Sequence, residues 1–145
     1  MLRVHASLIH ELDADLSAEH GLPLRSYEVL LFLEDAPRQR LRMTDLSRSV
    51  LLSASGVSRL VDRLETEGYV ARERCVDDGR GYYAVLTTGG AAKLTEARAT
   101  HLAGVRRHFL ERFDAADLAR LAVYWERVLP GAAGDPGRSD SPGAA

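Results

Sequence analysis

Residues 44–68 read TDLSRSVLLSASGVSRLVDRLETEG and indicate the fold more directly than any other segment. Thr44 is predicted to cap a short helix that extends to about Ser49, and after a tight turn at 50–52 Ser53 caps a longer one. Gly68 is expected to end the longer helix, because glycine readily adopts the left-handed backbone found there. A single apolar face runs along the longer helix at i, i+3, i+4 and i+7 spacing: Val57, Leu60, Val61 and Leu64. The pattern predicts a helix-turn-helix.

Two helices are predicted before this motif. Residues 1–20 keep near-helical apolar spacing, and Gly21 supplies the stop. Residues 24–35 form the second helix, whose continuous apolar run at 29–33 indicates a buried position. Residues 40–42 form a short extended piece that leads into Thr44.

A β-hairpin and two further helices are predicted after the motif. The β-like runs 69–74 and 82–86 flank an Asp-Gly tip, which is typical of a hairpin or wing. A long helix is expected from Thr88 to about Phe113, and Asp114 opens a last helix that Pro130-Gly131 stops. Residues 131–145 are rich in Gly, Pro, Ser and Asp, so we expect a disordered tail.

The predicted fold is mainly α with a small β wing. Residues 24–87 form a winged helix-turn-helix DNA-binding domain, and residues 1–23 and 88–130 supply dimerisation helices. The helices outside the winged domain carry more apolar surface than a 145-residue chain readily covers by itself. A two-fold homodimer would cover that surface and would read a pseudo-palindromic DNA site.

Charge is distributed unevenly along the chain, although its total is only −2. Residues 38–82 hold nine arginines against seven acids and carry +2, which leaves −4 for the remainder. Positive charge gathered on one segment is what a phosphate backbone requires. The segment coincides with the predicted winged domain.

Several classes of protein are disfavoured by what the sequence lacks. No apolar run approaches the roughly 18 residues of a membrane span, and no signal peptide is apparent, so we expect a cytoplasmic protein. The single Cys75 suits a reducing compartment. Neither a phosphate-binding loop nor a nucleophile motif nor metal-ligand spacing occurs among the residues, so we expect no enzyme, no metal and no cofactor.

The polar side of residues 53–67 is the candidate DNA-reading surface. Ser55, Arg59 and Asp62 lie opposite the apolar face at 100° per residue, with Ser58 and Arg63 beside them. Arginine can donate to guanine O6 and N7 in the major groove. The same pattern also fits an ordinary solvated helix face, and the basic wing that follows favours the DNA-reading interpretation.

The predicted wing tip is Asp78-Gly79-Arg80. An arginine on a thin loop can enter the minor groove, where the potential is most negative, and a neighbouring carboxylate can orient it. The candidate DNA-binding residues of the helix-turn-helix and wing are Thr44, Ser53, Ser55, Ser58, Arg59, Arg63, Arg72, Arg74, Asp78 and Arg80.

From about Pro23 to Pro130 the chain resembles the MarR (multiple-antibiotic-resistance regulator) family of bacterial transcription factors. The resemblance rests on SRLVDRL at 58–64, GYV at 68–70, DGRG at 78–81 and VLTTGGA at 85–91. It implies that residues 53–67 enter the major groove and that Arg80 enters the minor groove. It also implies a homodimer, built from the first helix and the last two, that acts as a repressor relieved by a small molecule.

The effector and the cysteine stay open at this stage. The family often binds small aromatic acids between the DNA-binding lobe and the dimer helices, so Tyr27, Phe32 and Trp125 are candidates for such a pocket, with core packing as the alternative. The first helix lacks the cysteine of the peroxide-sensing branch, so Cys75 is a structural residue or an oxidant sensor. The competing function is a winged-helix module that binds protein rather than DNA; its exposed helix face would be apolar or acidic.

Overall fold

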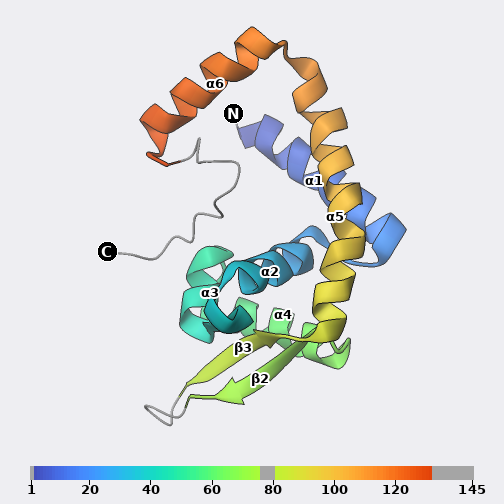
Figure 1. The fold of residues 1–145 in the computed structure, drawn as a ribbon, viewed down its shortest axis with the longest axis vertical. Coiled ribbons are helices and arrows are strands. Elements are labelled where there is room, and N and C mark those ends of the chain that lie inside the picture. The colour runs from blue at the N-terminus through green and yellow to red at the C-terminus, as the bar shows by residue number, and fades with distance from the viewer. Residues whose placement is uncertain (1, 76–80, 132–145) are drawn as a thin grey trace.

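A three-stranded antiparallel sheet closes one end of the molecule in the computed structural model, which describes residues 2–75 and 81–131 (Figure 1). The strands are β1 (Arg40–Arg42), β2 (Val70–Arg74) and β3 (Tyr82–Leu86), in the order β1-β3-β2. Leu41 and Arg72 both pair with Ala84, so β3 lies in the middle. The hairpin and the short extended piece predicted from the sequence therefore form one sheet.

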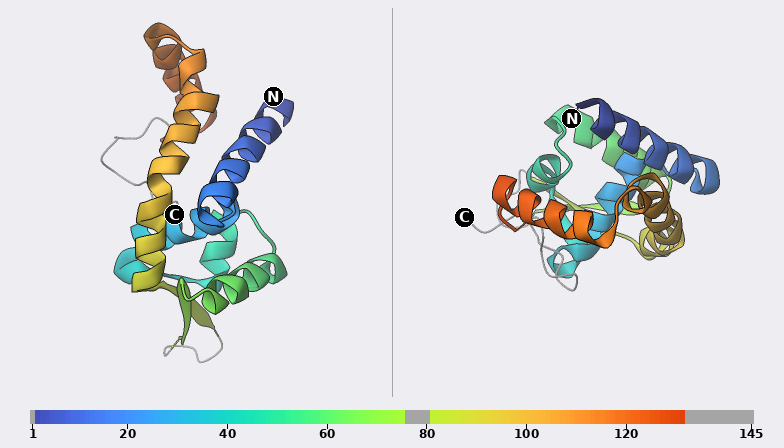
Figure 2. Two further views of the ribbon diagram at one scale, coloured as in Figure 1. Left: turned by 90° about the vertical axis from the view of Figure 1, so that its right-hand side faces the viewer. Right: turned by 90° about the horizontal axis from the view of Figure 1, so that it is seen from above.

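Helices cover this sheet and extend away from it. They are α1 (Leu2–His20), α2 (Leu24–Asp35), α3 (Met43–Ser49), α4 (Ala54–Thr66), α5 (Thr88–His108) and α6 (Ala115–Val128). Two 3-10 turns, Pro37–Gln39 and Leu110–Arg112, precede β1 and α6 respectively. Helices α3 and α4 with the turn between them form the helix-turn-helix, and α5 rises from the sheet to α6 at the opposite end (Figures 1 and 2).

One hydrophobic core joins the helix-turn-helix to the rest of the chain. It takes side chains from α1, α2, α3, α4 and α5 and from the sheet. Burying a large aliphatic side chain contributes about 1.5–3 kcal/mol relative to leaving it in water. The leucines that reach zero exposure are Leu16, Leu22, Leu30, Leu33, Leu46, Leu64 and Leu94.

Helices α1 and α5 lie close together because Gly104 has no side chain. A Cβ at this position would lie 2.9 Å from Cδ2 of Leu12 and 3.0 Å from Oδ2 of Asp15. Asp15 also accepts from His108 at 3.0 Å and from Arg107 at 2.7 Å. The two helices are therefore held by packing at Gly104 and by polar contacts one turn further along α5.

Helix α6 packs differently from all the others, since it has no buried residue. Val123, Tyr124, Trp125 and Val128 are 53%, 54%, 43% and 72% exposed, and Leu129 just after the helix is 64% exposed. Leaving so many apolar side chains in water is unfavourable, and exposed apolar surface of this kind is typical of sites that bind another molecule.

Most element boundaries agree with the sequence predictions. The predicted helix at 1–20 is confirmed over its described residues, Leu2–His20, and so is the helix at 24–35. The Ser53 and Asp114 caps are also confirmed, because Ser53 Oγ accepts from the Gly56 N–H at 3.1 Å and Asp114 Oδ1 accepts from the Asp117 N–H at 2.8 Å. Gly68 has φ +78°, the left-handed conformation expected at a helix end.

Two predictions about helix ends are wrong. Thr44 does not cap α3: the helix begins at Met43, Arg42 takes the cap position, and the Thr44 side chain lies within the first turn. The long helix does not reach Phe113 but ends at His108, where Phe109 leaves helical geometry with φ −126° and ψ −65°. Its last turn contains Arg106, Arg107 and His108, and positive side chains are favourable at the negative end of a helix dipole.

Candidate nucleic-acid interface

Helix α4 has one buried face and one polar face. Val57, Val61 and Leu64 are at most 1% exposed, while Ser55 and Arg59 on the other side are exposed. The burial pattern follows the helical spacing expected from the sequence. The helix therefore offers short hydroxyls and a guanidinium to solvent, backed by a rigid apolar core.

The beginning of α4 is arranged to receive an anion. Ser53 caps the first turn, and its Oγ lies 3.2 Å from Ser55 Oγ. The exposed N–H groups and the helix dipole give this end a partial positive charge. No acidic residue stands in the first turn. A DNA phosphate is the kind of group that this end of the helix can bind.

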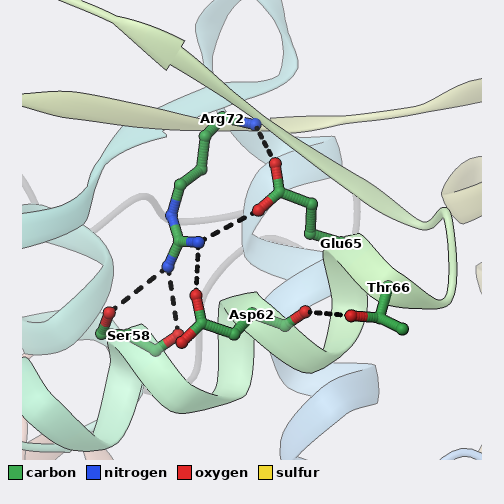
Figure 3. A network of polar contacts seen from close by, with 5 residues as sticks. All are labelled: Ser58, Asp62, Glu65, Thr66 and Arg72. Atoms are coloured by element: carbon green, nitrogen blue, oxygen red, sulfur yellow. Dashed lines mark hydrogen bonds and ion pairs between the residues drawn. The ribbon is translucent and has the colours of Figure 1, made fainter.

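Arg72 points into the protein instead of toward solvent (Figure 3). From β2 its guanidinium donates to the carboxylates of Asp62 and Glu65 on α4, at 3.0 Å in the case of Glu65. It also donates to the carbonyl oxygen of Ser58 at 3.1 Å and to Ser58 Oγ at 3.3 Å. Only 21% of the Arg72 side chain is exposed. Its donors are occupied by α4, which makes Arg72 a link between the sheet and this helix.

The same network changes the charge that α4 presents. Helical spacing places Asp62 on the polar side of the helix, where its carboxylate would repel phosphates. Pairing with Arg72 offsets the charges of Asp62 and Glu65 without removing them, since these side chains are 58% and 43% exposed. The contribution of Glu65 was missed from the sequence; its i, i+3 spacing from Asp62 is the signal that places both acids beside β2.

Arg63 joins α4 to α2. One of its guanidinium nitrogens donates to Oγ of Ser26 at 2.9 Å, and Ser26 is fully buried. A buried hydroxyl without a partner is costly, so Arg63 satisfies a group that would otherwise destabilise the core. Nothing in the sequence pattern identifies this pair, because 37 residues separate its members.

The other predicted DNA-binding residues fall into two groups. Thr44 on α3 and Arg74 at the end of β2 are exposed. Asp78 and Arg80, the predicted wing tip, lie outside the described residues. The structure thus brings Ser53, Ser55, Ser58 and Arg59 together at the start and along the polar side of α4. Arg72 is directed from β2 onto α4, and Arg63, although exposed, donates to Ser26 on α2.

The candidate effector residues are not gathered at one place in a single chain. Tyr27 on α2 is 2% exposed, and its ring centroid lies 4.6 Å from that of His101 on α5. Phe32, also on α2, is partly buried against the core. Trp125 lies on α6, at the far end of α5 from the sheet (Figures 1 and 2). Tyr27 and Phe32 thus pack in or against the core, and the assignment of all three residues to an effector pocket stays a prediction.

Burial perturbs the titration of two rings where α2 packs against α5. It raises the pKa of the Tyr27 phenol above its ordinary value, although the Arg98 guanidinium acts in the opposite direction. Burial lowers the pKa of the His101 imidazole, and the charge of Glu28 opposes this shift. Among the described residues, Nδ1 of His101 is buried without a hydrogen-bond partner. Arg98 is itself paired with Glu34.

Cys75 is 2% exposed at the end of β2 and forms no disulfide. Within residues 2–75 and 81–131, no three His, Cys, Asp or Glu side chains gather as a metal site would require. In the same residues, no helix combines the length and apolar character needed to cross a membrane.

Comparison with known proteins agrees with this geometry. The model of the MarR family matches residues 20–81. The HTH-type transcriptional repressor YetL of Bacillus subtilis is 30% identical over 88 residues, which are 61% of this chain and 53% of YetL. The chain thus spans about half the length of this relative.

Two solved structures from Streptomyces coelicolor extend the similarity to most of the chain. AbsC, a MarR family transcriptional regulator, is 35% identical with a TM-score of 0.79, and the match covers 88% of this chain and 85% of AbsC. Sco3205, a MarR family transcriptional regulator solved in complex with DNA, is 33% identical with a TM-score of 0.81, and the match covers 90% of this chain and 81% of Sco3205.

Proposed function

Because the chain belongs to the MarR family of transcriptional regulators, we propose that it is a sequence-specific DNA-binding regulator that reads a pseudo-palindromic operator as a homodimer. The family is one of regulators, not of enzymes. The similarity of this chain to Sco3205, which was solved in complex with DNA, supports the proposal.

The polar face of α4 is the observation that carries this function. Its Ser53 cap and its exposed Ser55 and Arg59 stand on a helix whose other face is fixed in the core. A protein-binding module would instead present an apolar or acidic face. In the proposed complex α4 enters the major groove, and Arg59 and Ser55 donate to base edges while Ser53 and Thr44 contact phosphates.

The wing completes the proposed contact with DNA. Arg80 enters the minor groove beside the half-site, Asp78 orients it, and Arg74 lies near the phosphates. Ser58, Arg63 and Arg72 act on DNA indirectly, by fixing the position of α4 against β2 and α2. This assignment modifies the sequence-based expectation, which treated all three as contacts.

The proposed dimer uses residues 1–23 and 88–130. The exposed apolar side chains of α6 support it, because a second copy related by a two-fold axis would cover them. Residues 24–87 then form the DNA-binding unit of each subunit, and two α4 helices would contact half-sites about one helical turn apart.

We propose that the outcome is repression, as the similarity to the repressor YetL suggests, and that a small aromatic molecule relieves it, as the sequence resemblance to the family implies. Tyr27 and Phe32 would line one side of the effector site, and Trp125 of either subunit would reach it only in the dimer. Cys75 is assigned a structural role, since a thiol that is 2% exposed reacts poorly with oxidants. Such a regulator would act in the bacterial cytoplasm, where the chromosome is.

Selection from random-sequence DNA tests the proposal. The wild-type protein should enrich a pseudo-palindrome and bind it about 10³-fold or more tightly than scrambled DNA of the same length. Affinity should fall steeply with salt, because each contacted phosphate releases counterions. Sedimentation of the complex should give two chains per duplex. Failure to enrich any sequence, by a protein that is folded and dimeric, contradicts the proposed function.

A further inference from the structure

An exposed leucine stands in the turn of the helix-turn-helix, just before the helix proposed to read DNA. Leu51 is 85% exposed, whereas Val50 is 1% exposed and Leu52 packs against the core. Within the described part of 24–87, Tyr82 at 43% is the only other large apolar side chain that is exposed. The rest lie in residues 1–23 and 88–130. Leu51 therefore belongs neither to the core nor to the segments proposed to form the dimer.

The backbone of Leu51 has a conformation in which glycine is usual. Its φ angle is +53°. The Leu51 N–H donates to the Arg48 carbonyl at 3.3 Å, and the Leu52 N–H donates to the Ser47 carbonyl at 3.1 Å. These two bonds end α3 as a Schellman motif, whose left-handed position is commonly a glycine. A Cβ at that position approaches the following carbonyl oxygen, so a leucine there is strained.

The residues on both sides hold this conformation in place. The Val50 N–H donates to the Leu46 carbonyl at 3.0 Å. On the other side, Cβ of Leu52 lies 3.5 Å from the place that a Cβ on Gly56 would take, so Leu52 also packs against the first turn of α4. The fold thus requires a left-handed residue at position 51 but leaves most of the leucine side chain in solvent. A single exposed leucine is ordinary, whereas strained backbone is concentrated at binding sites.

The surroundings of Leu51 indicate what its side chain contacts. Ser53, Ala54 and Ser55 at the start of α4 are exposed, and so is Arg59 one turn further along. A protein partner would need about 800 Å² of surface on each side, which one leucine among hydroxyls and a guanidinium does not supply. The major groove of DNA offers an apolar group of matching size, the 5-methyl group of thymine.

We propose that Leu51 contacts the 5-methyl group of a thymine in each half-site. The inference rests on the proposed insertion of α4 into the major groove and names one base that the operator contains. Leu51 lies two residues before the Ser53 cap, so its side chain would enter the groove together with the first turn of α4. Removal of water from the methyl group and from the leucine favours the contact. Cytosine has no methyl group at this place and would be disfavoured.

Deoxyuridine in place of thymine tests the proposal, because uracil lacks only the 5-methyl group and pairs with adenine in the same way. The operator is the sequence selected by the wild-type protein, with one thymine replaced at a time, and fluorescence anisotropy gives the affinity. At one position the wild type should lose about 3- to 5-fold in affinity, as expected for the burial of a single methyl group. Leu51→Met keeps an apolar side chain and should keep this dependence.

Two further variants separate the side chain from the backbone. Leu51→Ala removes the side chain beyond Cβ and keeps the strain, whereas Leu51→Gly removes both. Each should bind the thymine operator about 3- to 5-fold less tightly than the wild type and should not distinguish thymine from uracil at that position. Leu51→Gly should melt about 2–4 °C above Leu51→Ala, because glycine adopts this backbone without steric cost. Weaker binding by the more stable variant would not reflect loss of the fold.

Three results overturn the inference. The first is equal affinity of the wild type for the thymine and uracil forms at every position. The second is a dependence on the methyl group that persists in Leu51→Ala and Leu51→Gly, which would assign the contact to another residue such as Ala54. The third is a Leu51→Gly variant no more stable than Leu51→Ala, since the turn would then not be strained. Failure of the wild type to select any operator contradicts the proposed function instead, so the two failures are distinguishable.

Discussion

Arg72 on β2 and Glu65 on α4 form an ion pair at 3.0 Å that ties the wing sheet to the helix proposed to read DNA. Asp62 and Ser58 share the same guanidinium, so a single side chain fixes the separation of the two parts that are proposed to enter adjacent grooves. Positioning of this kind affects binding without any contact to the DNA.

Replacement of Arg72 should therefore separate positioning from contact. Arg72→Gln should weaken binding to every DNA sequence and should cost about 1 kcal/mol of stability, a modest value because its acidic partners are partly exposed. The slope of log Kd against log salt should stay unchanged. A slope shallower by about one ion would instead identify Arg72 as a phosphate contact. Arg72→Lys should not restore binding, since an ammonium group cannot reproduce the planar fork.

Arg59 should contribute to the choice of sequence. Its exposed position opposite the buried face of α4 predicts that Arg59→Ala lowers operator affinity by about 1–3 kcal/mol and reduces discrimination against mutated operators. Fluorescence anisotropy with a set of single-base operator variants would measure both effects. A loss of equal size on every duplex would assign Arg59 to the phosphate backbone.

The exposed apolar end of α6 should be required for dimer formation. Val128 and Leu129 are 72% and 64% exposed, so Val128→Glu with Leu129→Glu should leave the folded subunit intact while placing charge in the proposed interface. Sedimentation should show a monomer, and operator binding should be lost. Deletion of residues 132–145 is the matched control and should change neither property. A stable dimer of the double variant would contradict the proposed role of α6.

Two glycines of α5 should differ in their tolerance of a methyl group. A Cβ on Gly90 would lie 2.1 Å from the Tyr69 carbonyl oxygen, whereas one on Gly104 would meet the flexible end of Leu12 at 2.9 Å. Gly90→Ala should destabilise the protein by about 2 kcal/mol or more, because backbone must move. Gly104→Ala should cost less, since the gain in helix propensity of about 0.5–1 kcal/mol offsets part of the strain. Urea unfolding of both variants checks the order.

His101 should make stability depend on pH. Burial lowers the pKa of its imidazole in the folded state, so the unfolded chain takes up the proton first as pH falls. The stability that depends on a neutral His101 is present above its ordinary pKa of about 6.5 and is lost progressively below it. His101→Phe should remove this contribution, and thermal melts of both proteins between pH 5 and 8 would show whether their difference changes in the acid range.

The sequence predicted the elements well because their signals are local. Ser53 and Asp114 supply side-chain caps, Gly68 supplies a left-handed stop, and the apolar spacing of 57–64 matches the buried face of α4. The two errors also have a local cause. Thr44 is of a residue type that often caps helices, but α3 begins one residue earlier with Arg42 at the cap position. The helix break at Phe109 contains neither glycine nor proline, the residues that usually signal a helix end.

The candidate site was harder to predict because its details depend on side chains that meet through the fold. Helical spacing placed Arg59 and Ser55 on the polar face correctly. It could not reveal that Arg63 turns to the buried Ser26, or that Arg72 turns to α4. The sequence shows that a side chain is a charged arginine, but it does not show which way that side chain points. The orientation determines whether the guanidinium can contact DNA.

The exposed apolar side chains of α6 have a thermodynamic consequence for the proposed homodimer. When folding and association are linked, mass action raises apparent stability with protein concentration, so no single melting temperature describes the molecule. In a cell that makes few copies, part of the protein would then be monomeric. Each monomer would have a single α4 and a much lower affinity for the operator. The abundance of the protein would thus set how much of it is competent to regulate.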